Sequence, residues 1–179
     1  MSCEHFEESE DYAFIPNVFC EHQSAEMFRR ELQFNDRFEL AYYLIVEGFS
    51  VIPLWKDGSV PARRWKSFQA RQANLTELAD WFVFHDFCPA IVTGQLSRIT
   101  VVECDSPQAV MEWEASSPPT LVQQQTPRGR HFVYRHNHER NTLDRFLGID
   151  RRGEGGYIKA FPDSRHWTAK SVKAAPLLC

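Results

Sequence analysis

Apolar residues recur at helical spacing in three stretches of the chain, and each stretch begins with a capping signature. The apolar faces are Leu40, Tyr43 and Leu44; Leu75, Leu78 and Phe82; and Val110, Met111 and Trp113. The capping pairs are Asp36 with Glu39, Asn74 with Glu77, and Ser106 with Pro107. We predict three helices, which end at Gly48, at about Phe84 and before Pro118.

Shorter apolar runs, bounded by turn residues, predict strands between and after these helices. The runs are Phe49 to Trp55, Ala90 to Thr93, Ile99 to Asp105, Leu121 to Gln125, His131 to Arg135 and Gly156 to Phe161. Helix and strand patterns interleave, so the sequence predicts an α/β domain. We expect this domain over residues 35–170, after a poorly organised acidic segment at 1–34 and before a tail at 171–179.

Composition and charge are ordinary for a soluble globular protein of one domain. The chain has 179 residues, of which 43% are hydrophobic and 25% are charged. Its longest apolar runs fall short of the roughly 20 residues that a membrane helix needs. The N-terminal residues lack the basic and apolar regions of a signal peptide. We therefore expect a cytoplasmic protein with no membrane partner.

The net charge of −4 argues against tight non-specific binding of nucleic acid, which needs many contacts from lysine and arginine to phosphates. Arginines nevertheless crowd one third of the chain, at positions 128, 130, 135, 140, 145, 151 and 152. Two interpretations stay open for this cluster: a surface that faces phosphates, or an ordinary solvated surface.

The five cysteines show no close spacing of the kind that zinc or redox sites use. An odd number of cysteines in a chain without an export signal indicates free thiols. Cys88 and Cys104 lie within apolar runs and are expected in the core. We therefore expect no zinc.

Two carboxylates share one face of the predicted strand that ends at Asp105. Alternate side chains of a strand point the same way, so Glu103 and Asp105 project together. Neighbouring carboxylates repel each other, and a hard cation such as Mg²⁺ or Mn²⁺ removes that repulsion. Two such ions can hold the attacking and leaving oxygens of a phosphoryl transfer. From this pattern alone, two exposed carboxylates at a strand end remain the simpler interpretation.

A histidine opens the strand that follows a short arginine-glycine turn. Arg128, Gly129 and Arg130 directly precede His131. Glycine permits a tight turn and the close approach of a ligand, and imidazole and guanidinium groups suit a triphosphate. Taken by itself, the pattern also fits a surface histidine at the beginning of a strand.

A third acidic candidate, Asp150, precedes a glycine-rich run. Gly153, Gly155 and Gly156 fall within four positions, which indicates an unusual backbone path. Asp150 can serve as a third metal ligand or simply as a turn or capping aspartate. The run lacks the Lys-Ser/Thr ending of a phosphate-binding P-loop.

Taken in order, these motifs resemble the bifunctional DNA primase/polymerase N-terminal domain of the archaeo-eukaryotic primase superfamily. The resemblance extends from about Leu40 to Trp167. It is carried by residues 41–54 with Pro61 and Trp65, by residues 91–105, by residues 126–134 and by residues 149–158.

The resemblance implies roles for individual residues. Glu103, Asp105 and Asp150 would hold two Mg²⁺ or Mn²⁺ ions, and His131 would complete the catalytic set by contacting the phosphates of the incoming nucleotide. The implied nucleotide-binding residues are Thr126, Arg128, Gly129, Arg130, His131 and Arg152.

The implied fold is the archaeo-eukaryotic primase fold, of the α/β (α+β) class. In it, an RRM-like mixed sheet with flanking helices joins a small N-terminal α/β unit. The implied activity is template-directed nucleotidyl transfer, as DNA primase and DNA polymerase, in the replication of a plasmid, phage or other mobile element. The implied partners are nucleoside triphosphates, a DNA template and primer, and a helicase or priming partner.

The sequence departs from the family pattern at three places. Glu103 stands where an aspartate is usual, Val60 stands where a basic residue is common, and residues 161–167 replace a Pro-Pro-Ser run. A longer carboxylate side chain loosens metal geometry. These departures leave open a second hypothesis, that of a catalytically silent module that binds nucleotides or nucleic acid.

Overall fold

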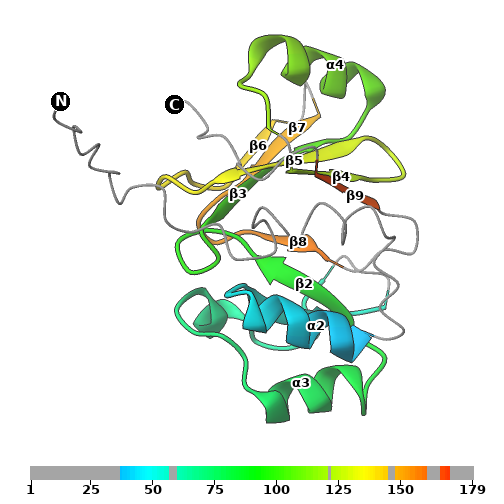
Figure 1. Cartoon of the computed structure of the whole chain (residues 1–179), viewed down its shortest axis with the longest axis vertical. Coiled ribbons are helices and arrows are strands. Elements are labelled where there is room, and N and C mark those ends of the chain that lie inside the picture. Colours follow the sequence, from blue (N-terminus) through cyan, green and yellow to red (C-terminus); the bar gives the residue numbers. More distant parts are fainter. Residues whose placement is uncertain (1–36, 57–59, 121, 145–147, 161–165, 170–179) are drawn as a thin grey trace, which may run out of the picture.

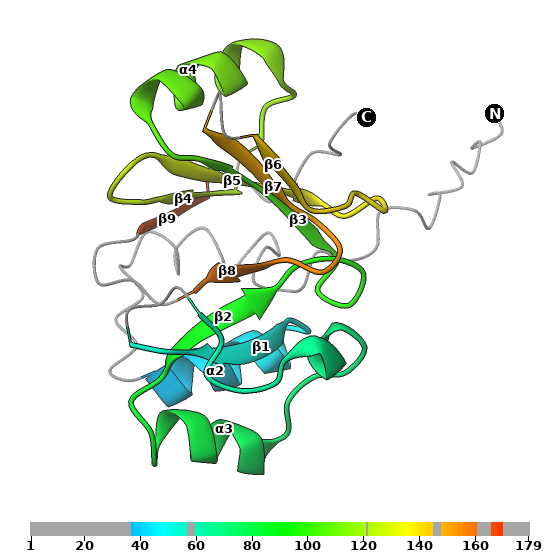
Figure 2. The same ribbon diagram turned by 180° about the vertical axis from the view of Figure 1, so that it is seen from behind.

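The protein is built from two antiparallel sheets that lie between helices. The computed structural model describes residues 37–56, 60–120, 122–144, 148–160 and 166–169. A three-stranded sheet has the order β1-β2-β8, and a six-stranded sheet has the order β6-β7-β3-β5-β4-β9. Figures 1 and 2 show α2 and α3 on the outer side of the smaller sheet and α4 on the outer side of the larger one. The fold therefore belongs to the expected α+β class.

The smaller layer combines β1 (Ser50–Leu54), β2 (Cys88–Val92) and β8 (Tyr157–Lys159) with α2 (Arg37–Val46) and α3 (Leu75–Phe82). A short 3-10 helix, η3 (Lys66–Gln69), lies between β1 and α3 in the chain. Every residue of β1 and β2 is buried. Burial on both faces is expected for strands that lie between helices and a second sheet, and it explains why these strands are apolar at every position but Ser50.

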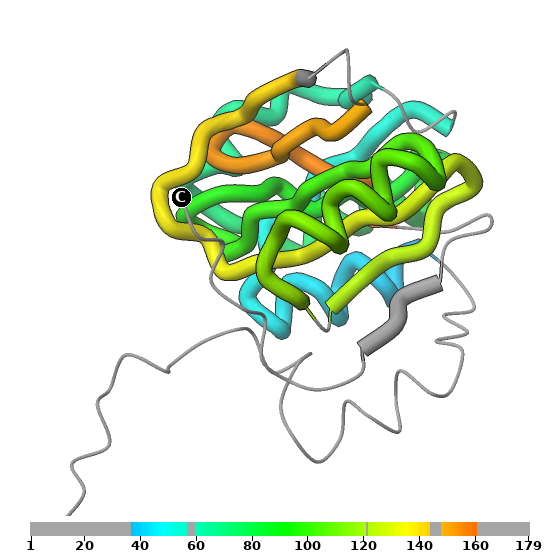
Figure 3. The backbone as a smooth tube through the Cα atoms, turned by 90° about the horizontal axis from the view of Figure 1, so that it is seen from above, coloured from blue at the N-terminus to red at the C-terminus, as the bar shows by residue number. Residues whose placement is uncertain are grey.

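The larger layer is centred on β3 (Ile99–Cys104), which pairs with β5 (Arg130–Arg135) on one side and with β7 (Ile149–Arg152) on the other. Its remaining strands are β4 (Val122–Gln125), β6 (Thr142–Asp144) and β9 (His166–Ala169). The helix α4 (Pro107–Ser116) runs across the outer face of this sheet, as the view from above shows (Figure 3).

The two faces of β3 have different surroundings because strand side chains alternate. Val102 and Cys104 pack with Phe132 and Ala109 in a small core under α4. Val101 faces the other way and joins the main core, which continues into the smaller sheet and its helices. Glu103 shares the inward face of Val101, so its carboxylate enters the space between the two sheets.

Local signals predicted the starts of α3 and α4 and the end of α2 correctly. Asn74 and Glu77 form a reciprocal capping box at the start of α3, with both hydrogen bonds 2.9 Å long. The hydroxyl of Ser106 accepts from the backbone N–H of Ala109 at the start of α4. Gly48 has a φ of 90° just after α2, which confirms its predicted place at the helix end. Asp36 and the N-terminal segment lie outside the described residues.

The sequence patterns missed β6, β7 and β9 and extended α3 two residues too far. Residues 149–152 read Ile-Asp-Arg-Arg and carry almost no apolar signal. They form a strand because β3 and β6 bond to their two edges. Asp150 is therefore a strand residue, and the alternative of a turn or capping aspartate is wrong.

The glycine-rich run after β7 carries the chain from the larger sheet to the smaller one. A Cβ at Gly153 would overlap the carbonyl oxygen of Glu139, and one at Gly156 would overlap Asn141 and Thr93. The hydroxyl of Thr93 also donates to the carbonyl of Gly153 at 2.7 Å. These glycines therefore permit close backbone packing at the crossover between sheets.

Within these described ranges, no helix combines the length and apolar character needed to span a membrane.

Candidate active site

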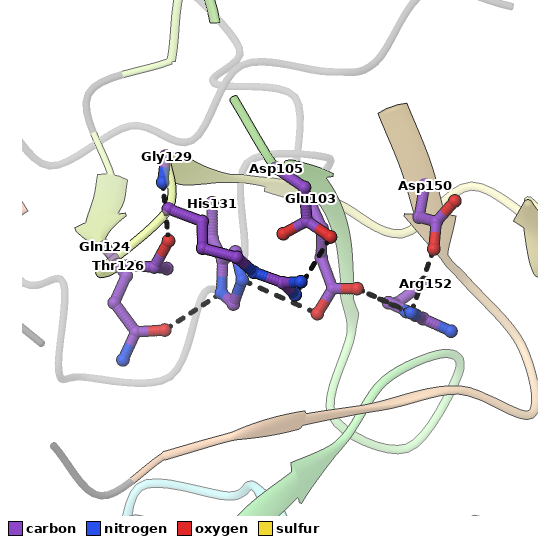
Figure 4. A network of polar contacts seen from close by, with 9 residues as sticks. Glu103, Asp105, Gln124, Thr126, Gly129, His131, Asp150 and Arg152 are labelled. Atoms are coloured by element: carbon purple, nitrogen blue, oxygen red, sulfur yellow. Dashed lines mark hydrogen bonds and ion pairs between the residues drawn. The ribbon is translucent and has the colours of Figure 1, made fainter. Parts of the chain in front are cut away.

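The strand register places three predicted site residues side by side. Glu103 of β3 lies directly opposite His131 of β5 and directly opposite Asp150 of β7. Directly opposed residues of antiparallel strands project to the same face, about 5 Å apart. Figure 4 shows the three side chains in a row on the inner face of the larger sheet. The pairing thus brings together groups that are far apart in the sequence.

Glu103 is the centre of this row and is largely buried. Its side chain is 16% exposed, with one oxygen 3.5 Å from Nε2 of His131 and the other accepting from Nε of Arg152 at 2.6 Å. Burial raises the pKa of the Glu103 carboxyl, and the charge of Arg152 opposes that rise. A carboxyl group this buried stays ionised only when a positive charge lies beside it.

Asp105 follows directly after β3, at the edge of the site. The backbone N–H of Asp105 donates to the carbonyl of Gly148, which ties the end of β3 to the start of β7. One of its oxygens accepts from Arg128 at 3.1 Å, and its side chain is 43% exposed. Asp105 is thus the most accessible of the three carboxylates.

His131 lies on β5, between the neighbouring strands β3 and β4. Its ring is 6% exposed, and Nδ1 lies 2.9 Å from the amide oxygen of Gln124 on β4. Because Nδ1 faces Gln124 on one side, Nε2 is directed at Glu103 on the other. Gln124 is fully buried directly opposite His131. The sequence motifs did not single out Gln124, because one glutamine among three in a row carries no distinguishing signal.

The turn before His131 is held tightly against the end of β3. The hydroxyl of Thr126 accepts from the N–H of Gly129 at 3.0 Å. A Cβ at Gly129 would overlap the carbonyl oxygen of Cys104. Only glycine fits here, and the turn it permits directs Arg128 towards Asp105. Thr126, Arg128 and Gly129 therefore lie in the turn beside the end of β3, and their binding of nucleotide stays a prediction.

Arg130 lies on the opposite face of the sheet. It pairs with Glu114 of α4 at 2.6 Å and bonds to Gln123. Adjacent residues of a strand face opposite sides, so Arg130 and His131 cannot both face the carboxylates. The expected place of Arg130 in the nucleotide pocket is therefore corrected: its guanidinium belongs to the α4 side.

Tyr157 of β8 stands on the facing sheet. Its ring meets Trp65 edge to face at 5.3 Å between centroids. Burial raises the pKa of the Tyr157 hydroxyl, while the nearby charges of Arg152 and Glu103 act in opposite directions on it. The smaller sheet thus contributes an aromatic pair near the acidic row, which the sequence motifs had not singled out as part of the site.

The donor set suits a hard divalent cation in its chemistry. Three carboxylates with an imidazole beside them match the oxygen-rich ligation that Mg²⁺ and Mn²⁺ prefer. Among the residues that the structure describes, no three such side chains converge closely enough to form a metal-binding group. Arg152 bonds to Glu103 and Asp150, and Arg128 bonds to Asp105, so the carboxylates turn towards arginines.

A comparison with known families identifies the family of the chain. The family model for the bifunctional DNA primase/polymerase N-terminal domain matches residues 41–177, which is more than half of the chain. The chain therefore belongs to the bifunctional DNA primase/polymerase N-terminal family. No curated protein matches the chain significantly.

Proposed function

We propose that this protein transfers nucleotides to DNA on a template, in a reaction that depends on Mg²⁺ or Mn²⁺. The family supports DNA primase or polymerase chemistry in general terms. The observation that carries the finer proposal is the direct cross-strand opposition of Glu103 to both Asp150 and His131. Three strands that meet at this point hold groups suited to charge stabilisation and phosphate binding.

Glu103, Asp105 and Asp150 are the residues that would hold the cations. Bound there, two ions would lower the pKa of the attacking hydroxyl and neutralise charge on the leaving pyrophosphate. In the reaction, the 3′-oxygen of a primer bonds to the α-phosphorus of a nucleoside triphosphate. The bond to the β-phosphate breaks, pyrophosphate leaves, and the hydroxyl proton is released.

The side chains around the carboxylates would bind and orient the triphosphate. Arg128 is 75% exposed beside Asp105, and a guanidinium suits bidentate contact with phosphate. Gln124 holds His131 in one orientation, so that Nε2 faces the acidic row. Preorganised donors of this kind stabilise developing charge without rearranging during the reaction. The protein thereby supplies position and charge.

A second function has specific support. Both Glu103 and Asp150 are already paired with Arg152, and Glu103 replaces the usual aspartate. A site whose carboxylates stay with arginine would bind nucleotide without turnover. This module would still serve replication, for example beside a helicase or priming partner on a plasmid or phage.

The decisive experiment measures incorporation of labelled nucleotide on a primed DNA template with Mg²⁺ or Mn²⁺. We expect activity in the wild type and a loss on the order of 100-fold or more in Asp105→Ala and Glu103→Gln, the scale of removing one electrostatic contact to the reacting group. Glu114→Gln is the matched control, because Glu114 is a carboxylate on the other side of the sheet.

Equal incorporation by wild type and Asp105→Ala would refute the site assignment. Nucleotide binding that needs no divalent cation, without any incorporation, would favour the silent module. Thermal melting of each variant separates loss of chemistry from loss of folding.

A further inference from the structure

The guanidinium of Arg152 bridges two carboxylates that the proposed function assigns to a cation. Its Nε donates to Glu103 at 2.6 Å, and its terminal nitrogen donates to Asp150 at 3.1 Å. The side chains of Arg152, Glu103 and Asp150 are 27%, 16% and 23% exposed. Charge-assisted hydrogen bonds in so shielded a place are strong. Arg152 is therefore the internal counter-ion of this acidic pair.

The backbone holds Arg152 rigidly, while its side chain can turn. Arg152 lies opposite Val101 on the inner face of the sheet, next to the crossover between sheets. The adjacent Gly153 is bonded on both sides, by Asn141 at its N–H and by Thr93 at its carbonyl. A long arginine side chain on a fixed Cα can exchange partners without any movement of the fold.

A divalent cation and Arg152 need the same oxygens. Two carboxylates carry a charge of −2, and the guanidinium already offsets half of it. A cation that enters the pair must displace the arginine or share oxygens with a second positive charge, which is unfavourable at this separation. A triphosphate offers the displaced guanidinium a bidentate anionic partner nearby.

We propose that Arg152 competes with the divalent cation for Glu103 and Asp150, and that the triphosphate of the incoming nucleotide releases the site by binding Arg152. This inference rests on the proposed function, because it assumes that the cation uses these carboxylates. It makes tight binding of metal conditional on nucleotide. Without nucleotide, the site therefore binds a divalent cation only weakly.

Substitution of Arg152 should have opposite effects on the two ligands. In Arg152→Gln, we expect Mn²⁺ alone to bind about tenfold tighter or more, the scale of losing two competing hydrogen bonds to charged groups. The same variant should bind a nucleoside triphosphate more weakly in the presence of EDTA. A merely structural arginine would weaken both, because its loss would disorder the site.

The test uses the full chain, with free Mn²⁺ measured by electron paramagnetic resonance and triphosphate binding by equilibrium dialysis. Arg151→Gln is the matched control: it changes the net charge equally, but Arg151 pairs with Val102, on the face towards α4. Arg152→Lys keeps the charge without the fork and should give intermediate Mn²⁺ affinity. Thermal melting confirms that each variant is folded.

The outcomes separate this inference from the proposed function. Tighter Mn²⁺ binding in Arg152→Gln, abolished by adding Glu103→Gln, supports the competition. Equal affinity in wild type and Arg152→Gln, still lost in Glu103→Gln, would overturn the competition and leave the metal site standing. Weaker binding of both ligands would also overturn it. Absence of Mn²⁺ binding in every protein would contradict the metal site itself, and the competition with it.

Discussion

Nε2 of His131 lies 3.5 Å from a carboxylate oxygen of Glu103, while Nδ1 of the same ring is bonded to Gln124. The imidazole is thus fixed from one side by β4 and faces the central acidic residue on the other. This arrangement defines which nitrogen is directed at the proposed reaction centre. The orientation of the ring therefore depends on Gln124, a residue of β4 that lies outside the acidic row.

Gln124→Leu should lower the rate of nucleotide incorporation strongly and the free energy of unfolding modestly. The substitution removes the hydrogen-bond partner of His131 Nδ1, so we expect a cost of about 1–3 kcal/mol in unfolding free energy together with a misoriented ring. Urea denaturation and steady-state kinetics measure the two effects. Gln123→Leu is the control, because Gln123 bonds to Arg130 on the other face. Equal kinetic defects in both variants would contradict a positioning role for Gln124.

Gly129→Ala should displace the turn before His131. The added methyl group would overlap the Cys104 carbonyl, and relieving such overpacking typically costs about 1–3 kcal/mol. We expect reduced stability in chemical denaturation and weaker triphosphate binding. Arg128→Ala in the same turn adds no atoms and should weaken triphosphate binding with little change in stability. A Gly129→Ala protein as stable as the wild type would show that the turn can move freely.

Asn74→Ala should destabilise the protein by about 1 kcal/mol, the typical value for removing a side-chain N-cap. Asn74 accepts from the N–H of Glu77, and the Glu77 carboxylate accepts from the N–H of Asn74. Nucleotide incorporation should remain at the wild-type level, since α3 lies on the outer side of the smaller sheet. The exposed Thr76 provides the control, and Thr76→Ala should change the free energy of unfolding little. A loss equal to that of Thr76→Ala would argue against the cap.

Acidification should weaken the fold through a buried cluster around Thr100. Burial lowers the pKa of His136 from its usual 6.5, and its ring is 4% exposed. Burial also acts to raise the pKa of Glu139, but hydrogen bonds from Asn137 and Thr100 outweigh it and leave that pKa below 4.5. In both cases, the unfolded chain takes up protons before the folded protein does.

Both pKa shifts make the folded protein less stable as the pH falls. The contribution of His136 declines as pH falls below 6.5, and that of Glu139 declines as pH falls below 4.5. His136→Asn should therefore flatten the dependence of unfolding free energy on pH in the window just below 6.5. Urea denaturation at a series of pH values measures this slope. His85→Asn, at an exposed histidine, should keep the wild-type slope; an unchanged slope in His136→Asn would count against the cluster.

The sequence predicted the elements whose signals are local. The capping box at Asn74, the cap at Ser106 and the strand at Ile99 depend on residues within a few positions of one another, and the structure confirms them. The predicted apolar helix faces are confirmed only in part, because Leu75 and Met111 are exposed. The resemblance of the motifs to the primase/polymerase family is confirmed as well. The strand β7 escaped prediction, because Ile-Asp-Arg-Arg becomes a strand only through bonds to β3 and β6.

The candidate site also has some features that the local sequence predicts and others that only the fold determines. The sequence by itself placed Glu103 on the same face as Val101, since side-chain alternation is a property of any strand. Asp105 directly follows the last residue of β3, so alternation does not fix the direction of its side chain. Only the tertiary structure decided that Asp150 lies opposite Glu103 and that Arg152 bridges the two. It also decided that β5 begins at Arg130, which places Arg130 and His131 on opposite faces. These relationships are set by strand register and layer packing, and a register depends on hydrogen bonds between segments that are distant in the chain.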